Sequence, residues 1–408
     1  MMKYPDFCCR KLLFLAIFFF LGHSARAIEL SYKYNAGDKY RIVSTVNEDI
    51  FVDRVLSYRA EIINRISMEI SSVSGGLARH SATFQTAEKT DRVGSTSKQA
   101  IPFRWSRDYE SEFNQDRLGY MTIGDEYYMP MARNIPVFPG RDLNPGDTWK
   151  AAGTEVHDFR DSYGIDKPYR IPFVADYTYL GERDWKGTSY PAFSVSYRIF
   201  LESGKKEGRV FPRMIQGASD QTVYWDIDHG QAAAYEEYFR TIFFLSDGQV
   251  WEYRGRAEAE VIESPPMNKE DMAKEIAGEI EGIENASVRI SDEGIVISLE
   301  NIQFAPDSAT LMPWERPKLD KIAEILMKYP DRDILVGGHT ALAGTAAGRM
   351  QLSIERAGAV ADYLIGKKAR SADRVVIRGY GAERPIADNR TPEGMQRNRR
   401  VEITILEN

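Results

Sequence analysis

Two arginines and a serine recur at helical spacing near the C-terminal end of this 408-residue chain. Arg349, Ser353 and Arg356 stand at positions i, i+4 and i+7, so a helix over this segment places all three on one face. A guanidinium group is permanently charged and offers a planar fork of N–H donors that matches a carboxylate. The spacing therefore predicts a helix face that carries both guanidinium groups.

Catalytic chemistry has little support elsewhere in the sequence. It contains no Gly-x-Ser-x-Gly motif, no glycine-rich phosphate loop and no Cys/His pair. The histidines downstream of residue 27 are too scattered to suggest a zinc site: His80, His157, His229 and His339. We expect His339 to be a buried structural histidine, and Asp226 and Asp228 to be ordinary solvated or turn carboxylates. The sequence therefore predicts a non-enzymatic protein with no metal and no cofactor.

The predicted arginine helix belongs to a segment in which helices and strands alternate. Apolar residues at helical spacing predict helices over 319–326 and 350–364. Short apolar runs predict strands at 334–336, 375–377 and 401–405. This βαβαβ order indicates an α/β sandwich with its helices on one face of a mixed sheet.

The same segment, about residues 296–408, resembles the OmpA-like (OmpA/MotB-type) peptidoglycan-associating domain. Motifs in family order and at family spacing carry the resemblance: Ile302-Gln303-Phe304 with Ser308 and Leu311, Gly338-His339-Thr340 with Gly344, Leu352-Ser353 with Arg356-Ala357, Gly379-Tyr380-Gly381-Ala382-Glu383 with Pro385, and Asn389 with Asn398-Arg399-Arg400-Val401-Glu402. The resemblance covers just over a quarter of the chain.

This resemblance implies non-covalent binding of the peptide stem of peptidoglycan, chiefly through its zwitterionic diamino acid. It implies a site composed of Thr340, Ala341, Leu342, Arg349, Arg356, Asn398 and Arg399. In the family an acid directly follows the His-Thr pair, and an arginine lies fifteen residues further on; here those positions hold Ala341 and Arg356.

Two departures from the family pattern change the charge expected at this site. Ala341 offers no carboxylate to an ammonium group, and Arg349 stands where the family usually has an asparagine. A zwitterion should then bind more weakly, and a carboxylate or another anion better. In an alternative interpretation, Arg356 forms an ion pair within its own domain, with Glu383 or Asp388 as its partner.

The N-terminal 27 residues have the features of a secretory signal. Basic residues precede the apolar run 12–21, and Ala25-Arg26-Ala27 matches a signal peptidase site. Both cysteines, Cys8 and Cys9, lie within this segment, so the mature chain would contain none. The whole chain carries a formal charge of −7, which argues against a nucleic-acid partner. We predict an exported, periplasmic protein associated with the cell wall or the outer membrane.

Residues 28–264 are predicted to form an antiparallel β-rich domain. Period-two alternation predicts a half-buried strand over 57–70 and another over 251–261, the latter preceded by a turn at Ser246-Asp247-Gly248. We expect roughly ten strands in a sandwich or a strongly curved sheet, in which the aromatic stripes form the core.

The predicted boundary of the β-rich domain is Pro265-Pro266, because neither proline can donate to a sheet or continue a helix. Residues 265–285 are predicted to be a linker and a helix capped by Asn268, and residues 286–408 the OmpA-like domain, opening with a hairpin that turns at 291–293. We expect the two halves to fold independently.

The predicted function is a non-enzymatic envelope protein whose OmpA-like domain associates with peptidoglycan, weakly because of Ala341. One alternative is an outer-membrane β-barrel carrying a periplasmic OmpA-like domain. In the other, residues 28–264 bind a lipid or an outer-membrane or periplasmic protein, and the OmpA-like part is a scaffold that has lost peptidoglycan binding.

Overall fold

The computed structural model describes residues 27–94, 102–203, 210–262, 267–305 and 308–407. Its first half is built from strands: β1 (Lys39–Val52), β2 (Val55–Ser74), β3 (Leu77–Arg92), β4 (Phe103–Asp116), β5 (Met121–Ile123), β6 (Ala132–Arg133), β7 (Thr148–Phe159), β8 (Ile165–Trp185), β9 (Thr188–Glu202), β10 (Pro212–Asp226), β11 (Gln231–Leu245) and β12 (Val250–Ile262), with a short helix α1 (Arg160–Tyr163) after β7. The predicted signal segment and Pro265-Pro266 lie outside the described residues, apart from Ala27.

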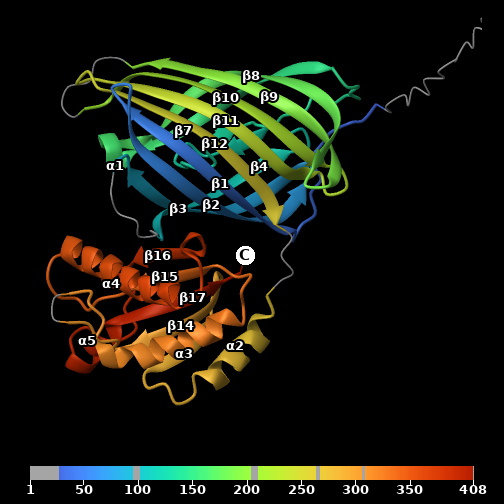
Figure 1. Ribbon diagram of the computed structural model, residues 1–408. Coiled ribbons are helices and arrows are strands. Elements are labelled where there is room, and N and C mark those ends of the chain that lie inside the picture. The colour runs from blue at the N-terminus through green and yellow to red at the C-terminus, as the bar shows by residue number, and fades with distance from the viewer. Residues whose placement is uncertain (1–26, 95–101, 204–209, 263–266, 306–307, 408) are drawn as a thin grey trace, which may run out of the picture.

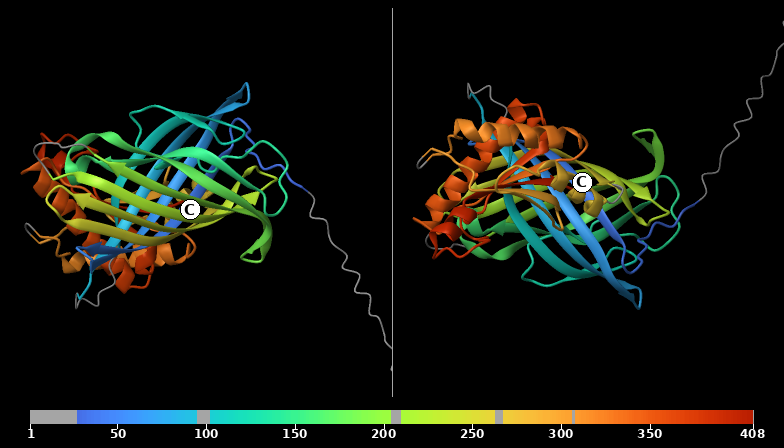
Figure 2. Two further views of the ribbon diagram at one scale, coloured as in Figure 1. Left: turned by 90° about the horizontal axis from the view of Figure 1, so that it is seen from above. Right: turned by 90° about the horizontal axis from the view of Figure 1, so that it is seen from below.

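The long strands form one strongly curved antiparallel sheet, the second of the two predicted arrangements (Figures 1 and 2). Each strand pairs with the next along the chain from β1 to β4 and from β7 to β12, and β1 also pairs with β12. The register joins Ile50 to Tyr253 and Ile42 to Val261, so apolar residues of neighbouring strands share the concave face. Alternating sequence thus becomes a sheet with an apolar inner face.

Aromatic side chains fill much of this inner face, as the stripes in the sequence predict. Trp149 stacks on Tyr177 with ring centroids 5.0 Å apart, and Phe138 meets Trp225 edge-on at 4.7 Å. Tyr32, on the segment before β1, adds a further edge contact to Trp225. The N-terminal segment therefore packs into the core of the β-rich half.

The second half contains helices α2 (Lys269–Glu279), α3 (Arg316–Met327), α4 (Ala346–Gly366) and α5 (Pro392–Asn398), and strands β13 (Ala286–Ile290), β14 (Gly294–Glu300), β15 (Ile334–Gly338), β16 (Val375–Gly379) and β17 (Arg400–Leu406). The spatial order of strands is β13-β14-β17-β15-β16, with β15 and β16 parallel and the other neighbours antiparallel. Asn268 caps α2 as predicted, since its side chain accepts from the amide of Asp271. No described helix is both long and apolar enough to span a membrane.

The two halves meet at the face of this second sheet that α2, α3 and α4 leave uncovered (Figure 1). The start of β4 pairs in parallel with β16, matching Phe103 with Val376, so the second sheet continues into the first half. Phe103 and Ala87 pack against Leu335, Val376 and Leu406 in a small apolar cluster. Independent folding of the halves stays a prediction, but an apolar contact and a strand pair join them.

The interface also holds ion pairs. Arg378 of β16 lies 2.8 Å from Asp108 of β4, and Arg41 of β1 lies 3.1 Å from Glu407. Arg65 of β2 is paired with Asp333, the residue before β15. Partly buried pairs of this kind fix orientation more than they add stability.

His80 gives a test of the β-rich core. Its ring is fully buried and stacks on Phe113, and burial lowers the pKa of His80 from 6.5 to about 4. The unfolded chain therefore takes up a proton below pH 6.5 that the folded chain rejects, so stability falls as the pH drops from about 6.5 towards 4. We expect His80→Phe to reduce the loss of unfolding free energy between pH 7 and pH 5 by about 2 kcal/mol, measured by urea unfolding. Equal losses in both proteins would contradict this burial.

Candidate ligand-binding cleft

The candidate cleft is the region where α4 closely approaches the ends of β15 and β16. A Cβ atom added to Gly338 would lie 2.0 Å from the carbonyl oxygen of Ser353, and one added to Gly379 would lie 2.5 Å from the Ser353 hydroxyl oxygen. The Ser353 hydroxyl also accepts a hydrogen bond from the amide of Gly381 at 3.0 Å. Glycines at the strand ends therefore allow the helix to sit directly on them, with Ser353 buried between.

The two loops that follow these strands are joined by backbone hydrogen bonds. The amide of Thr340 donates to the carbonyl of Gly381 at 2.7 Å, and the amide of Tyr380 donates to the carbonyl of Gly338 at 2.9 Å. Ala341 follows with only 6% of its surface exposed, whereas Leu342 is 58% exposed at the mouth. The predicted residues Thr340 to Leu342 are therefore one short, backbone-anchored loop.

Asn398 supports this loop from the far side, as an interior residue. It is 1% exposed, and its side-chain oxygen accepts from the amides of Ile386 and Ala387 at 2.8 and 3.0 Å. Its amide group donates at 2.9 Å to Asn389, whose side-chain oxygen also accepts from the Leu342 amide at 3.1 Å. Asn389 is thus the link that the predicted site lacked, although its place in the 389–398 motif was a signal for it.

The two predicted arginines leave α4 towards different segments. Arg349 donates to the carbonyl of Gly344, in the loop that also holds Ala341. Arg356 lies over the ring of Phe304 at 5.0 Å and donates to the carbonyl of Ser308 at 3.4 Å, on the chain that leads into α3. Asp388, one of the suggested partners of Arg356, is paired with Arg390 at 2.8 Å. Arg399 is exposed at the end of α5.

His339 is a buried histidine, as the sequence predicts. Its ring is buried and stacks on Tyr380 at 4.7 Å, and burial lowers its pKa. Burial alone would raise the pKa of nearby Glu402, but contacts with His339 and Arg400 bring it well below its usual range. His339 therefore packs behind the cleft, where it is 2% exposed.

Fold and candidate site together define a class of protein module: an α/β sandwich in which the loops after two parallel strands meet the start of a long helix. The family follows from comparison with known sequences. Residues 303–399 match the OmpA family, so the chain contains an OmpA family domain there, of a non-enzymatic class. The N-terminal region matches no family.

Curated relatives match between a quarter and a third of this chain. The peptidoglycan-binding protein ArfA of Mycobacterium tuberculosis (strain ATCC 25618 / H37Rv) is 38% identical over 104 residues, 26% of this chain and 32% of the relative. The probable lipoprotein YiaD of Escherichia coli (strain K12) is 39% identical over 120 residues, 29% of this chain and 54% of the relative. The chain thus spans between a third and about half of these relatives' length.

A solved structure, that of an outer membrane protein from Borrelia burgdorferi B31, is 34% identical in sequence. The match covers 30% of this chain and 97% of that one, with a TM-score of 0.26.

The support given by Asn398 can be tested by truncation. Asn398→Ala removes acceptors from two backbone amides and the link to Asn389, so we expect a loss of roughly 1–3 kcal/mol in unfolding free energy. The amide of Leu342 should exchange faster with solvent. The matched control is Arg399→Ala, an exposed neighbour, which should change stability by less than about 0.5 kcal/mol. An Asn398→Ala protein as stable as this control would refute the supporting role.

Proposed function

We propose that this protein is exported to the cell envelope and that its OmpA-like domain associates non-covalently with the peptide stem of peptidoglycan. The observation that carries the proposal is the anchored loop Thr340–Leu342 beside the first turns of α4, within a domain that matches the OmpA family. The name of the relative ArfA, a peptidoglycan-binding protein, supports the same ligand. Residues 286–408 are the proposed binding domain.

The cleft offers cationic and apolar groups but no acid at the expected position. Arg349 and Arg356 supply guanidinium groups suited to a stem carboxylate. Ala341 cannot pair with the ammonium of a diamino acid, and the neighbouring surface is apolar at Leu342 and Ile386, 58% and 41% exposed. We therefore propose that the domain binds a zwitterionic diamino acid weakly and a stem with an uncharged or anionic group there more tightly.

A second candidate is an envelope scaffold that no longer binds peptidoglycan. The same alanine at position 341 favours it, because an ammonium group at that position would lack a counter-charge. In that case residues 28–264 would carry the function through a protein or lipid partner.

Restoring the acid tests the proposal. A charge-assisted hydrogen bond contributes on the order of 1.5–3 kcal/mol, so Ala341→Asp should bind a diamino-acid stem peptide roughly tenfold or more tightly. The double variant Ala341→Asp with Arg349→Asn should bind best, because Arg349 can no longer pair with the new carboxylate. Calorimetry with a soluble stem peptide and sedimentation with purified cell-wall sacculi are the measurements.

Loss of the guanidinium gives the opposite expectation. Arg356→Ala should abolish the residual binding, whereas Arg198→Ala, an exposed arginine on β9, should leave it unchanged. Tight binding by the unaltered protein that survives Arg356→Ala would show that the stem lies elsewhere.

A further inference from the structure

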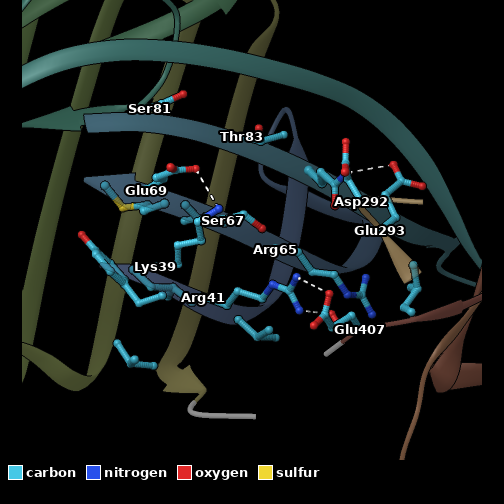
Figure 3. A pocket seen from close by; sticks show the side chains of 18 of the residues that line it. Lys39, Arg41, Arg65, Ser67, Glu69, Ser81, Thr83, Asp292, Glu293 and Glu407 are labelled. Carbon is cyan, nitrogen blue, oxygen red and sulfur yellow. Dashed lines mark hydrogen bonds and ion pairs between the residues drawn. The ribbon is translucent and has the colours of Figure 1, made fainter. Parts of the chain in front are cut away.

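A large groove runs between the two halves of the molecule. Its volume is about 1470 Å³. Small-molecule sites usually have volumes of about 300–1,000 Å³, so the groove is larger than most of them. One wall is formed mainly by β1–β4, and the segment before β1 and the β10–β11 turn also line the groove; the other wall combines the β13–β14 turn with the helix-free face of the OmpA-like sheet. Figure 3 shows Ser67, Ser81 and Thr83 on the first wall and Asp292 and Glu293 across from them. The space suits an extended ligand.

The first wall carries a row of short polar side chains. Ser67 of β2 stands opposite Thr83 of β3 in the register, and Ser81 stands opposite Glu69. Gln85, next along β3, donates to Glu293 of the opposite wall at 3.3 Å. Hydroxyl, amide and carboxylate groups on this strand surface are donors and acceptors for a ligand rich in hydroxyl and amide groups.

The charges lining the groove largely cancel. Among the described residues, seven lysines or arginines and nine aspartates or glutamates line it. Lys39 is paired with Glu69 at 3.1 Å, and Arg289 with Glu402 at 2.9 Å. Glu407 holds both Arg41 and Lys269 at the inner end, at 3.1 and 2.7 Å. Paired charges present little net field, so the groove favours an uncharged polar ligand over a strongly ionic one.

The groove and the cleft share a pair of neighbouring loops. Tyr380 and Gly337 line the groove. The Tyr380 amide is bonded to Gly338, and the next residue, Gly381, accepts the hydrogen bond from Thr340 of the cleft loop. Arg384, whose guanidinium lies 4.3 Å from the centre of the Tyr380 ring, also lines the groove. One pair of loops thus borders both features.

We propose that this groove binds the glycan strand of peptidoglycan, a polymer of N-acetylated amino sugars whose hydroxyl and amide groups match its walls. The inference rests on the proposed function, because it places the sugar beside a stem held in the cleft. A peptide residue spans at most about 3.6 Å, so a stem residue held in the cleft keeps its sugar within a few residues' length of it. Residues 28–264 then supply one wall of the sugar-binding groove, which an OmpA-like domain alone would lack.

Three probes and two variants of the whole chain from residue 28 test this. The probes are a disaccharide–stem muropeptide, the sugar-free stem peptide and stem-free glycan chains, each titrated by calorimetry. Ser67→Trp places a bulky ring in the groove, and Ser57→Trp, partly exposed on the same strand outside it, is the matched control.

The unaltered chain and Ser57→Trp should bind the muropeptide about tenfold or more tightly than the stem peptide. Ser67→Trp should reduce that ratio to about one while leaving stem-peptide binding unchanged, and should abolish glycan binding. Equal affinities for muropeptide and stem peptide in the unaltered chain would overturn the glycan site but leave the proposed function standing. The unaltered chain could instead bind glycan chains but no stem peptide, with glycan binding lost in Ser67→Trp. That result would overturn the proposed function and leave the glycan site standing.

Discussion

The arrangement of the two halves depends on covering both faces of one small sheet. Helices α2, α3 and α4 cover one face of the β13–β17 sheet, with Ile295, Ile297 and Val336 in the core beneath them. The other face carries Leu335, Val376 and Leu406, which are apolar and would be exposed without a partner. The β-rich half buries them with Phe103 and Ala87, and β4 pairs with the edge of β16. An exposed strand edge and an exposed apolar face are removed by the same contact.

This contact also explains how the cleft and the groove come to adjoin. Arg378 is paired with Asp108 of β4 and lies over the Tyr380 ring at 4.8 Å, so the loop after β16 is held from the β-rich side. Tyr380 in turn stacks on His339, and the two loops exchange backbone hydrogen bonds. The position of the β-rich half therefore bears directly on the loops that form the cleft.

Local signals in the sequence predicted much of the fold, whereas contacts between distant residues could not be predicted from it. Alternation over 57–70 predicted β2, the Asn268 cap predicted α2, and the 291–293 turn predicted the β13–β14 hairpin, because each depends on neighbours along the chain. Helix α5 was missed, although Thr391 caps it and Pro392 opens it, because seven residues carry too little apolar periodicity. The β4–β16 pair joins residues far apart in sequence, and no local pattern encodes such a pair. Helical spacing placed Arg349 and Arg356 on one face but could not show that their long side chains reach different loops.

Amide hydrogen exchange of Val376 and Ile377 in the whole chain tests the docking of the two halves most directly. Both residues pair with β15 on one side and with β4 on the other, and successive amides of a strand point to opposite neighbours. Docking therefore predicts that both amides exchange as slowly as those of the central strand β17. Slow exchange at one and fast exchange at the other would mean that β4 does not cover this edge, which would contradict the shared interface and the groove built on it.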